Sequence, residues 1–380
     1  MAIMGGTGGT GGTGGTGGTG GTGGTGGANL NFTGLGSFLG AGADPVYDPL
    51  LVQGLQIAEQ AITHVANPYP AGEFRELAFS APGNMALWAD WVRASLYITE
   101  FLKDLDWTVG EEDRAVSLTY GRHGHYGGGD EQADHNKFYA VRRPDVGTFK
   151  AQLKFMRAYM DQRPDRAPEI ITQLGFPTPY FAMLLGLQVG ANSHTFELIS
   201  IAQVLAAHVA MVVKHHLACR RPDRIGATVM PPIPTPAHGS FPSAHATEAF
   251  AVATVLNAFV ERQRHHYTDF QARQALISKL AERIAVNRTV AGVHFPIDTW
   301  AGAILGRAVG QIVLAKCGDR TSVQAYAYSA KGDLDFFGHE FAKGTNDPYG
   351  VTKTGSIEVG RSGLFAWLWD KACEEFELQR

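Results

Sequence analysis

Residues 244–263 read AHATEAFAVATVLNAFVERQ, and this run decides the fold because it contains neither glycine nor proline while its apolar residues recur every three or four positions. That spacing predicts a helix with a wide apolar face. Two further long helical patterns, residues 196–219 and 298–317, lie before and after it in the chain. Apolar helix faces must be buried against one another. The sequence therefore predicts packed helical bundles that include residues 244–263.

Helical patterns also cover most of the remaining chain, whereas strand-like alternation is scarce. They lie at residues 48–67, 85–105, 146–162, 181–187, 269–286 and 364–375. Two stretches, Trp107 to Pro144 and Met230 to Pro242, show no regular period and are expected to be long loops, which are often functional. The predicted fold class is all-α, made of packed helical bundles.

The N-terminus differs in composition from the rest of the chain. Residues 5–27 are seven GGT triplets followed by two glycines, which have no side chains able to pack a core. We expect residues 1–28 to form a flexible tail and residues 29–380 to form one catalytic domain. With 44% hydrophobic and 18% charged residues, the 380-residue chain as a whole is not of the disordered class.

Charge and cysteine content exclude several classes of protein. A formal net charge of −4 provides no general attraction for nucleic acid, so any anion site must be local. The cysteines are odd in number and far apart, which argues against a disulfide framework or a thiolate zinc site: Cys219, Cys317 and Cys373.

The N-terminal segment lacks the layout of a signal peptide, and the best apolar stretches, residues 249–260 and 299–315, are too short or carry Arg307. We therefore expect a soluble, cytoplasmic protein with no transmembrane segment.

The chemistry is expected between residues 214 and 298, beginning with a pair of basic residues. Lys214 and Arg221 are seven residues apart, close to two helical turns, which predicts that both lie on one face of a helix that Pro222 ends. Two fixed cations on one face favour an anion as ligand.

A second element that could bind an anion follows the proline-rich loop. Ser243 stands at the expected N-cap of the central helix, just before Ala244 and His245. Free backbone N–H groups and the positive end of the helix dipole favour negative charge at such a position.

The third element combines Arg288, His294 and Asp298. Asp298 is four residues after His294 and is expected to accept a hydrogen bond from one ring nitrogen, which leaves the other nitrogen as a nucleophile or metal ligand. Taken together, the three elements predict a cradle for a tetrahedral oxyanion.

The spacings KxxxxxxRP, PSxH and Rx5Hx3D resemble the signature of the phosphatidic acid phosphatase type 2 and vanadium haloperoxidase superfamily. Here they read KHHLACRRP (214–222), PSAH (242–245) and NRTVAGVHFPID (287–298). The sequence has Ala244 where the family usually has glycine, and Asn287 where it often has serine or glycine. Alanine keeps the backbone N–H, so the expected contact survives unless the position needs a positive φ.

The resemblance implies a role for each motif residue. Five would surround the oxygens of vanadate or phosphate: Lys214, Arg221, Ser243, the N–H of Ala244, and Arg288. His245 would be the general acid and base. His294 would bind vanadium in a peroxidase or attack phosphorus in a phosphatase, with Asp298 behind it.

The sequence of residues 238–256 resembles the corresponding region of the algal-type vanadium bromoperoxidases, which carry an extra histidine where His238 stands. We therefore favour a vanadium-dependent haloperoxidase, with orthovanadate on His294, that uses hydrogen peroxide to oxidise bromide or iodide and halogenates a small organic acceptor. His238 is predicted to project into the pocket mouth near His245 as a further catalytic residue. Such relatives commonly form oligomers, so a homo-oligomer is allowed.

Two alternatives stay open. The short gap between Pro222 and Pro242 is typical of compact acid phosphatases, which favours a soluble phosphomonoesterase that acts through a phosphohistidine and needs no cofactor. A non-enzymatic anion-binding domain is disfavoured because His245 and His294 are both intact. Three histidines of the Gly-rich loop lack compact ligand spacing and are expected to be solvated: His123, His125 and His135.

Overall fold

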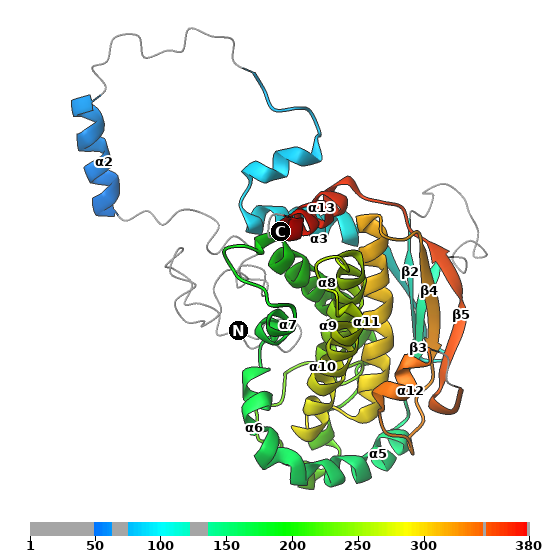
Figure 1. The fold of residues 1–380 in the computed structure, drawn as a ribbon. Helices are drawn as coiled ribbons and strands as arrows, with labels where there is room; N and C mark the ends of the chain where they lie inside the picture. Colours follow the sequence, from blue (N-terminus) through cyan, green and yellow to red (C-terminus); the bar gives the residue numbers. More distant parts are fainter. Residues whose placement is uncertain (1–48, 63–74, 122–135, 345–346, 378–380) are drawn as a thin grey trace.

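The computed structural model describes residues 49–62, 75–121, 136–344 and 347–377 (Figure 1). The helices of the N-terminal half are α2 (Pro49–Ile62), η3 (Pro82–Leu87), α3 (Asp90–Leu102), α5 (Val146–Tyr159), η4 (Met160–Gln162), α6 (Arg163–Thr172) and α7 (Thr178–Leu185). The later helices are α8 (Ser193–Leu217), η5 (Pro222–Arg224), η6 (Ala227–Val229), α9 (Ala244–Arg262), α10 (Phe270–Val290), α11 (Pro296–Cys317), α12 (Gly338–Ala342), η7 (Asp347–Tyr349) and α13 (Gly363–Glu377). The strands are β1 (Leu105–Gly110), β2 (Ala115–Tyr120), β3 (Lys137–Arg142), β4 (Ser322–Tyr328) and β5 (Val351–Glu358).

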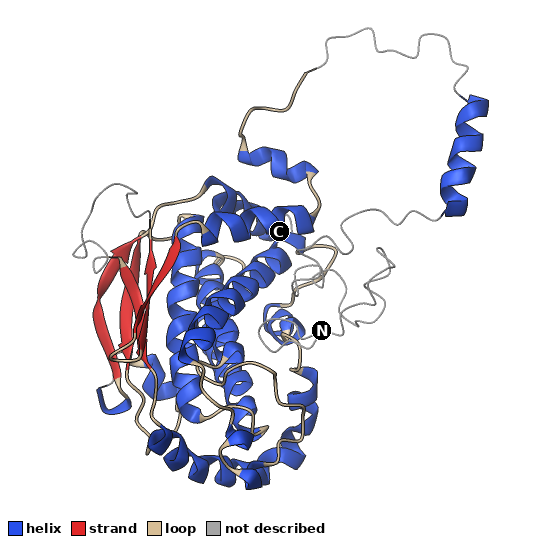
Figure 2. Ribbon diagram, turned by 180° about the vertical axis from the view of Figure 1, so that it is seen from behind, coloured by secondary structure: helices blue, strands red, loops and turns tan. Residues whose placement is uncertain are grey.

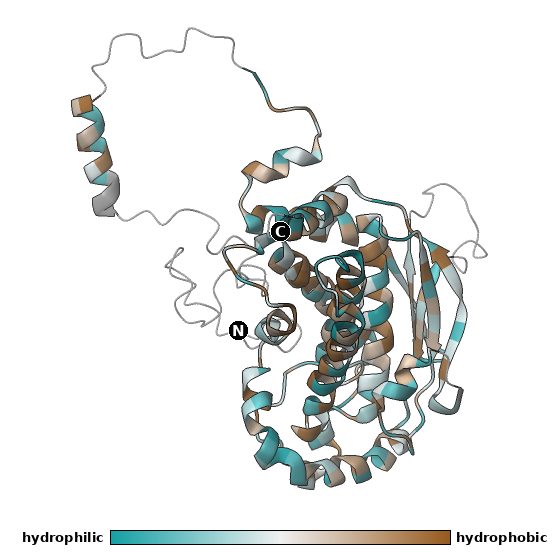
Figure 3. Cartoon of the chain, viewed as in Figure 1, coloured by the Kyte–Doolittle hydropathy of each residue, from teal (hydrophilic) through white to brown (hydrophobic). Residues whose placement is uncertain are grey.

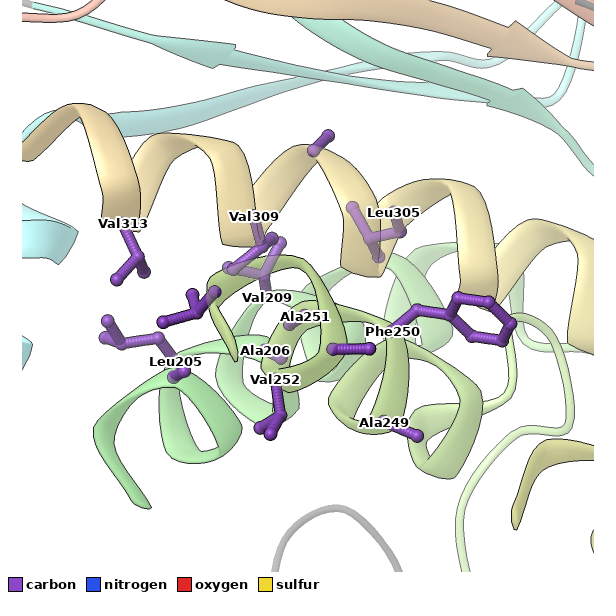
Figure 4. Packing of buried hydrophobic residues seen from close by; sticks show 14 of the residues in the cluster. Leu205, Ala206, Val209, Ala249, Phe250, Ala251, Val252, Leu305, Val309 and Val313 are labelled. Atoms are coloured by element: carbon purple, nitrogen blue, oxygen red, sulfur yellow. The ribbon is translucent and has the colours of Figure 1, made fainter. Parts of the chain in front are cut away.

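Four long helices form the core, as the sequence predicts. α9 lies in the middle and packs against α8, α10 and α11, while α13 packs across α8 and α11 (Figure 1). Apolar residues concentrate in this central group of helices (Figure 3). The close-up shows the side chains that interdigitate there, among them Leu205, Val209, Val252, Leu305 and Val309 (Figure 4). The ends of these helices and the loops that join them carry the motif residues.

A row of glycines on α11 lets its backbone touch that of α9. A Cβ atom added to Gly302 would come within 2.4 Å of the carbonyl oxygen of Ser243, and one added to Gly306 would come within 2.2 Å of that of Thr247. At the same end, the N–H of Ser243 donates to the carbonyl oxygen of Asp298 at 2.9 Å. The first turns of α9 and α11 are therefore held side by side.

A five-stranded sheet covers the bundle, so the prediction of an all-α fold is only roughly right. The strand order is β1-β2-β3-β4-β5, antiparallel except for the parallel pair β3 and β4. The sheet packs on α11 through β3 and β4 (Figures 1 and 2). Residues 107–144, expected to be a loop, contain most of its first three strands.

The strands were missed because each is short, with six to eight residues, although β1 and β2 do alternate apolar residues with polar or small ones. β1 and β5, at the two edges of the sheet, expose most of their residues. In β4 a register shift between Ala325 and Tyr326 interrupts the period of two. The short helix α6 was missed as well, because Pro164 and Pro168 normally mark breaks.

One helical segment contradicts the expectation that no apolar stretch could cross a membrane. Residues Ser193–Arg224, built on α8, are long and apolar enough to do so by length and composition, and 83% of the most apolar window is buried inside the fold. Residues 249–260 and 299–315 are too short or carry Arg307, but residues 198–213 within α8 contain no Asp, Glu, Lys or Arg.

The N-terminal tail, residues 1–28, lies outside the described residues, so the division of the chain at residue 28 stays a prediction. The helix predicted after Asp48 is present as α2, and its residues 53–62 are exposed.

Candidate active site

The motif residues come together where α8 and α10 end and α9 and α11 begin. Lys214 lies in the last turn of α8, Arg288 lies near the end of α10, and His245 lies in the first turn of α9. Arg221 and His294 lie in the loops that follow α8 and α10. None of these side chains is more than 5% exposed. Chain segments far apart in the sequence thus form one buried polar cluster.

The expected hydrogen bond between His294 and Asp298 is present. Nδ1 of His294 lies 3.0 Å from Oδ2 of Asp298, which also accepts from the N–H of Phe295 at 3.0 Å and from the hydroxyl of Ser240. A carboxylate oxygen accepts hydrogen bonds, so Nδ1 carries the proton and Nε2 keeps its lone pair. Sequence reasoning missed Ser240, whose only signal was its place three residues before Ser243, within residues 238–256.

The free ring nitrogen of His294 faces Arg221. Nη1 of Arg221 donates to Nε2 of His294 at 2.9 Å and to the carbonyl oxygen of Val293 at 2.8 Å. The prediction that Arg221 shares a helix face with Lys214 is wrong, because α8 ends at Leu217 and Ala218 takes a left-handed conformation with φ 47°. Arg221 reaches the cluster from the loop after that turn.

Lys214 holds the loop that carries Ser240. Its Nζ donates to the carbonyl oxygens of Gly239 at 2.8 Å and Ser240 at 2.9 Å, which leaves one of its three N–H donors for a ligand. Burial lowers the pKa of Lys214 well below its usual value, and the nearby Arg221 lowers it further.

His238 contacts Arg221. Its Nδ1 lies 3.2 Å from Nη2 of Arg221, and its carbonyl oxygen accepts from Nε of the same guanidinium at 2.9 Å. Burial and the charges of Lys214 and Arg221 lower the pKa of His238 to about 3, so the ring is neutral. Sequence reasoning placed this histidine near His245, whereas the contact that the structure shows is with the guanidinium.

Ser243 is the N-cap of α9, which confirms the predicted start of the central helix. Its hydroxyl oxygen accepts from the N–H of Ala246 at 3.3 Å. Ala244 begins the helix and its φ is not positive, so the position does not need the glycine that the family usually has.

His245 and Arg288 share a partner that the sequence did not identify. Nε2 of His245 donates to the carbonyl oxygen of Gln173 at 2.9 Å, and Nη2 of Arg288 donates to the side-chain oxygen of the same residue at 3.2 Å. Gln173 follows α6, in a stretch with no predicted helix, and no spacing marks it.

The cluster is poised for an anion. Burial lowers the pKa of Arg221 and of Arg288 to about 10, so both remain charged at neutral pH. Burial and the neighbouring cations lower the pKa of His245 and His294 well below the usual value, which keeps both rings neutral. Burial raises the pKa of Asp298, but hydrogen bonds from Ser240 and Phe295 and the nearby cations favour its ionised form.

Two histidines beside Lys214 in the chain do not share its buried environment. His215 is exposed and His216 is half-buried, whereas Lys214 is buried. His123, His125 and His135 fall outside the described residues. Within the described part of the chain, no group of three or more histidine, cysteine, aspartate or glutamate residues could hold a metal ion.

Comparisons with known proteins identify relatives of the region that forms this cluster. Residues 196–321 match the PAP2 superfamily. Two curated relatives are the decaprenylphosphoryl-5-phosphoribose phosphatases of Mycobacterium tuberculosis strains CDC 1551 / Oshkosh and ATCC 25618 / H37Rv. Each is 32% identical over 124 residues, which are 32% of this chain and 62% of the relative, so less than two thirds of either relative is covered.

A solved structure is also similar in part. It is the first transmembrane PAP2 type phosphatidylglycerolphosphate phosphatase from Bacillus subtilis, 21% identical, with a TM-score of 0.35. The similarity covers 43% of this chain and 82% of that protein.

These findings correct the functional hypothesis. The curated relatives are phosphatases, so the prediction of a vanadium-dependent haloperoxidase with vanadate, hydrogen peroxide and halide is wrong. The physical reason is that vanadate and phosphate are near-isosteres, so residues that cradle one also suit the other, and the choice rested on the local resemblance of residues 238–256, His238 included. The expectation that no segment could cross a membrane is corrected as well, because Ser193–Arg224 is long and apolar enough to do so. The expectation of a soluble, cytoplasmic chain depended on the lack of such a segment and falls with it.

Proposed function

We propose that residues 196–321, which match the PAP2 superfamily, are a phosphatase domain that hydrolyses phosphate monoesters through a phosphohistidine. One observation carries the proposal. Asp298 holds Nδ1 of His294 at 3.0 Å, so the lone pair of Nε2 is directed at Arg221, one of three buried cations in the cluster. A neutral imidazole beside fixed positive charge is a nucleophile aimed at an anionic substrate.

In the first step, Nε2 of His294 attacks phosphorus and the bond from phosphorus to the ester oxygen breaks. Arg221 donates to Nε2 in the free protein, and this N–H turns to a phosphoryl oxygen when the substrate binds. The cations Lys214, Arg221 and Arg288 neutralise the charge that develops on the phosphoryl oxygens. Asp298 balances the positive charge of the phosphorylated ring.

His245 supplies the proton that the leaving oxygen takes up. Burial and Arg288 lower its pKa in the free protein, and a bound phosphate dianion raises this pKa again because negative charge favours the protonated ring. In the second step a water molecule attacks phosphorus, His245 accepts its proton, and the bond from phosphorus to Nε2 breaks. Phosphate leaves with Nε2 of His294 free again, and His245, which took up a proton from solvent when the substrate bound, returns that proton to solvent.

Several observations support this reading over binding alone. The curated relatives are phosphatases, and both histidines stand in register with the three cations. The cluster accounts for recognition of the phosphoryl group. The assay therefore compares two different leaving groups.

The test uses the full chain with two substrates, p-nitrophenyl phosphate in solution and phosphatidate in detergent micelles, so that a water-soluble and a lipid leaving group are compared. We expect hydrolysis of at least one, and a phosphorylated histidine detected by mass spectrometry after alkaline quenching. His294→Ala should abolish both signals. A folded wild-type chain that hydrolyses neither substrate contradicts the proposal, as does a His294→Ala variant with full turnover.

A further inference from the structure

Several polar atoms of the buried cluster have no hydrogen-bond partner among the described residues. They are Nε2 of Gln173, Nε2 of His238, Nε of Arg288 and Oδ1 of Asp298. Three of these residues belong to the segment that carries the motifs, but Gln173 follows α6 and precedes the PAP2 domain. A buried amide that leaves its N–H groups unpaired destabilises the fold unless a ligand accepts from it.

The orientation of the Gln173 amide follows from its neighbours. Its side-chain oxygen lies 3.0 Å from Nδ2 of Asn287 and 3.2 Å from Nη2 of Arg288, and both of these atoms are donors. The opposite orientation would place the amino group against two donors. The oxygen is therefore the atom that faces Asn287 and Arg288, and the amino group is the free donor.

Gln173 is held firmly in this position. Asn287, which donates to Gln173, also donates to Glu169 at 2.9 Å and accepts from Arg166 at 3.1 Å. Glu169 in turn accepts two hydrogen bonds from Arg283, at 2.7 and 2.8 Å. This network joins α6 to α10, so the free amino group is preorganised rather than loosely placed.

The contacts of Gln173 place it between two parts of the proposed phosphatase site. Its carbonyl oxygen accepts from His245 at 2.9 Å, and its side chain accepts from the Arg288 guanidinium, whose Nε also has no partner in the described part of the chain. Gln173 itself is fully buried. An anion drawn in by the three cations is the acceptor that both free donors lack.

We propose that Gln173 is a phosphoryl-binding residue, whose amino group donates to a non-bridging oxygen of the bound phosphate beside Arg288. This proposal rests on the proposed function, because it assigns one more contact to the same phosphate. The turn after α6 thereby completes a site whose other residues all lie in the later, motif-bearing segment.

The test measures the affinity of the full chain for inorganic phosphate by titration calorimetry. Gln173→Met removes both polar atoms at similar size. Gln173→Glu keeps an oxygen toward Asn287 and Arg288 and replaces only the free amino group. We expect phosphate to bind at least about ten-fold more weakly to both variants, since each loses a hydrogen bond to an anion. Gln263→Met is the matched control, because Gln263 is also buried but caps the far end of α9.

Two outcomes overturn the proposal. Unchanged phosphate affinity in a folded Gln173→Met variant shows that the amide does not contact the ligand. Wild-type affinity in Gln173→Glu shows that only the oxygen matters, as a positioning partner of Arg288. The glutamate variant also serves if the methionine variant does not fold.

The binding assay separates this proposal from the phosphatase proposal. Wild-type protein that binds phosphate but hydrolyses no ester contradicts the phosphatase and still tests Gln173. If the wild-type protein hydrolyses an ester and both Gln173 variants bind phosphate with normal affinity, only the proposed role of Gln173 is contradicted. Wild-type protein that binds no phosphate overturns both.

Discussion

Asp298→Asn tests how the buried carboxylate supports His294. Oδ2 of Asp298 accepts three hydrogen bonds, from Ser240, His294 and Phe295, and Oδ1 has no partner among the described residues. The amide oxygen of asparagine can take the place of Oδ2 and its amino group the place of Oδ1. The substitution therefore keeps the hydrogen bonds and the tautomer of His294, and removes the negative charge.

The magnitude follows from the contact distance. Nδ1 of His294 lies 3.0 Å from Oδ2, which places the centres of charge roughly 4 Å apart when the ring is phosphorylated and positive. At an effective dielectric constant of about 20, such a pair is worth about 4 kcal/mol. The neutral amide retains part of this, so we expect a loss of about 2–4 kcal/mol, or roughly a 30- to 700-fold fall in kcat/KM.

Phosphate affinity should change in the opposite direction. Loss of a negative charge beside three cations makes the cluster more positive, so inorganic phosphate should bind Asp298→Asn as tightly as wild type or more tightly. The assay combines steady-state hydrolysis of the preferred ester with phosphate titration and a melting curve. Asp104→Asn is the control, because Asp104 pairs with Lys316 at the other end of α11.

Two results would refute this reasoning. One is a kcat/KM within three-fold of wild type in a folded variant, which would mean that the charge of Asp298 does not act on the reaction. The other is a fall in phosphate affinity that matches the fall in turnover, which would make Asp298 part of the binding surface instead.

The remaining predictions concern one contact, one titration and one packing position. Ser240→Ala removes a hydrogen bond to Asp298, and we expect roughly a three- to ten-fold lower kcat with about 1 kcal/mol lower unfolding free energy; unchanged kcat would show that the hydroxyl has no positioning role. The pKa of His245 is lowered by burial and by Arg288, and a general acid works in its protonated form, so kcat/KM should fall as pH rises through that pKa; a rate that increases from pH 5 to 8 would contradict this. Gly302→Ala places a Cβ within 2.4 Å of the Ser243 oxygen and should lower the unfolding free energy by about 1–3 kcal/mol together with activity, whereas Gly360→Ala, with no atom within 4 Å of the added Cβ, should do neither.

The long helices could be read from sequence because their signal is local. α8, α9 and α11 begin and end within a few residues of the apolar runs that predict them. The four-residue spacing of His294 and Asp298 likewise anticipates the hydrogen bond between them. In both cases the residues that interact are close in the chain, so periodicity and offset contain the information.

The sheet and Gln173 depended on tertiary structure for a different reason. β3 pairs with β4 across more than half of the described chain. Each strand, with six or seven residues, is too short to be predicted from its own sequence. Gln173 is brought to Arg288 by the packing of α6 on α10, 115 residues apart in sequence, and Ser240 reaches Asp298 across 58 residues. Sequence by itself determined the helical core and the residues of the phosphate motif, because these follow from local spacing. Only tertiary structure decided which further side chains hold that motif in place, because hydrogen bonds between distant segments leave no period in the chain.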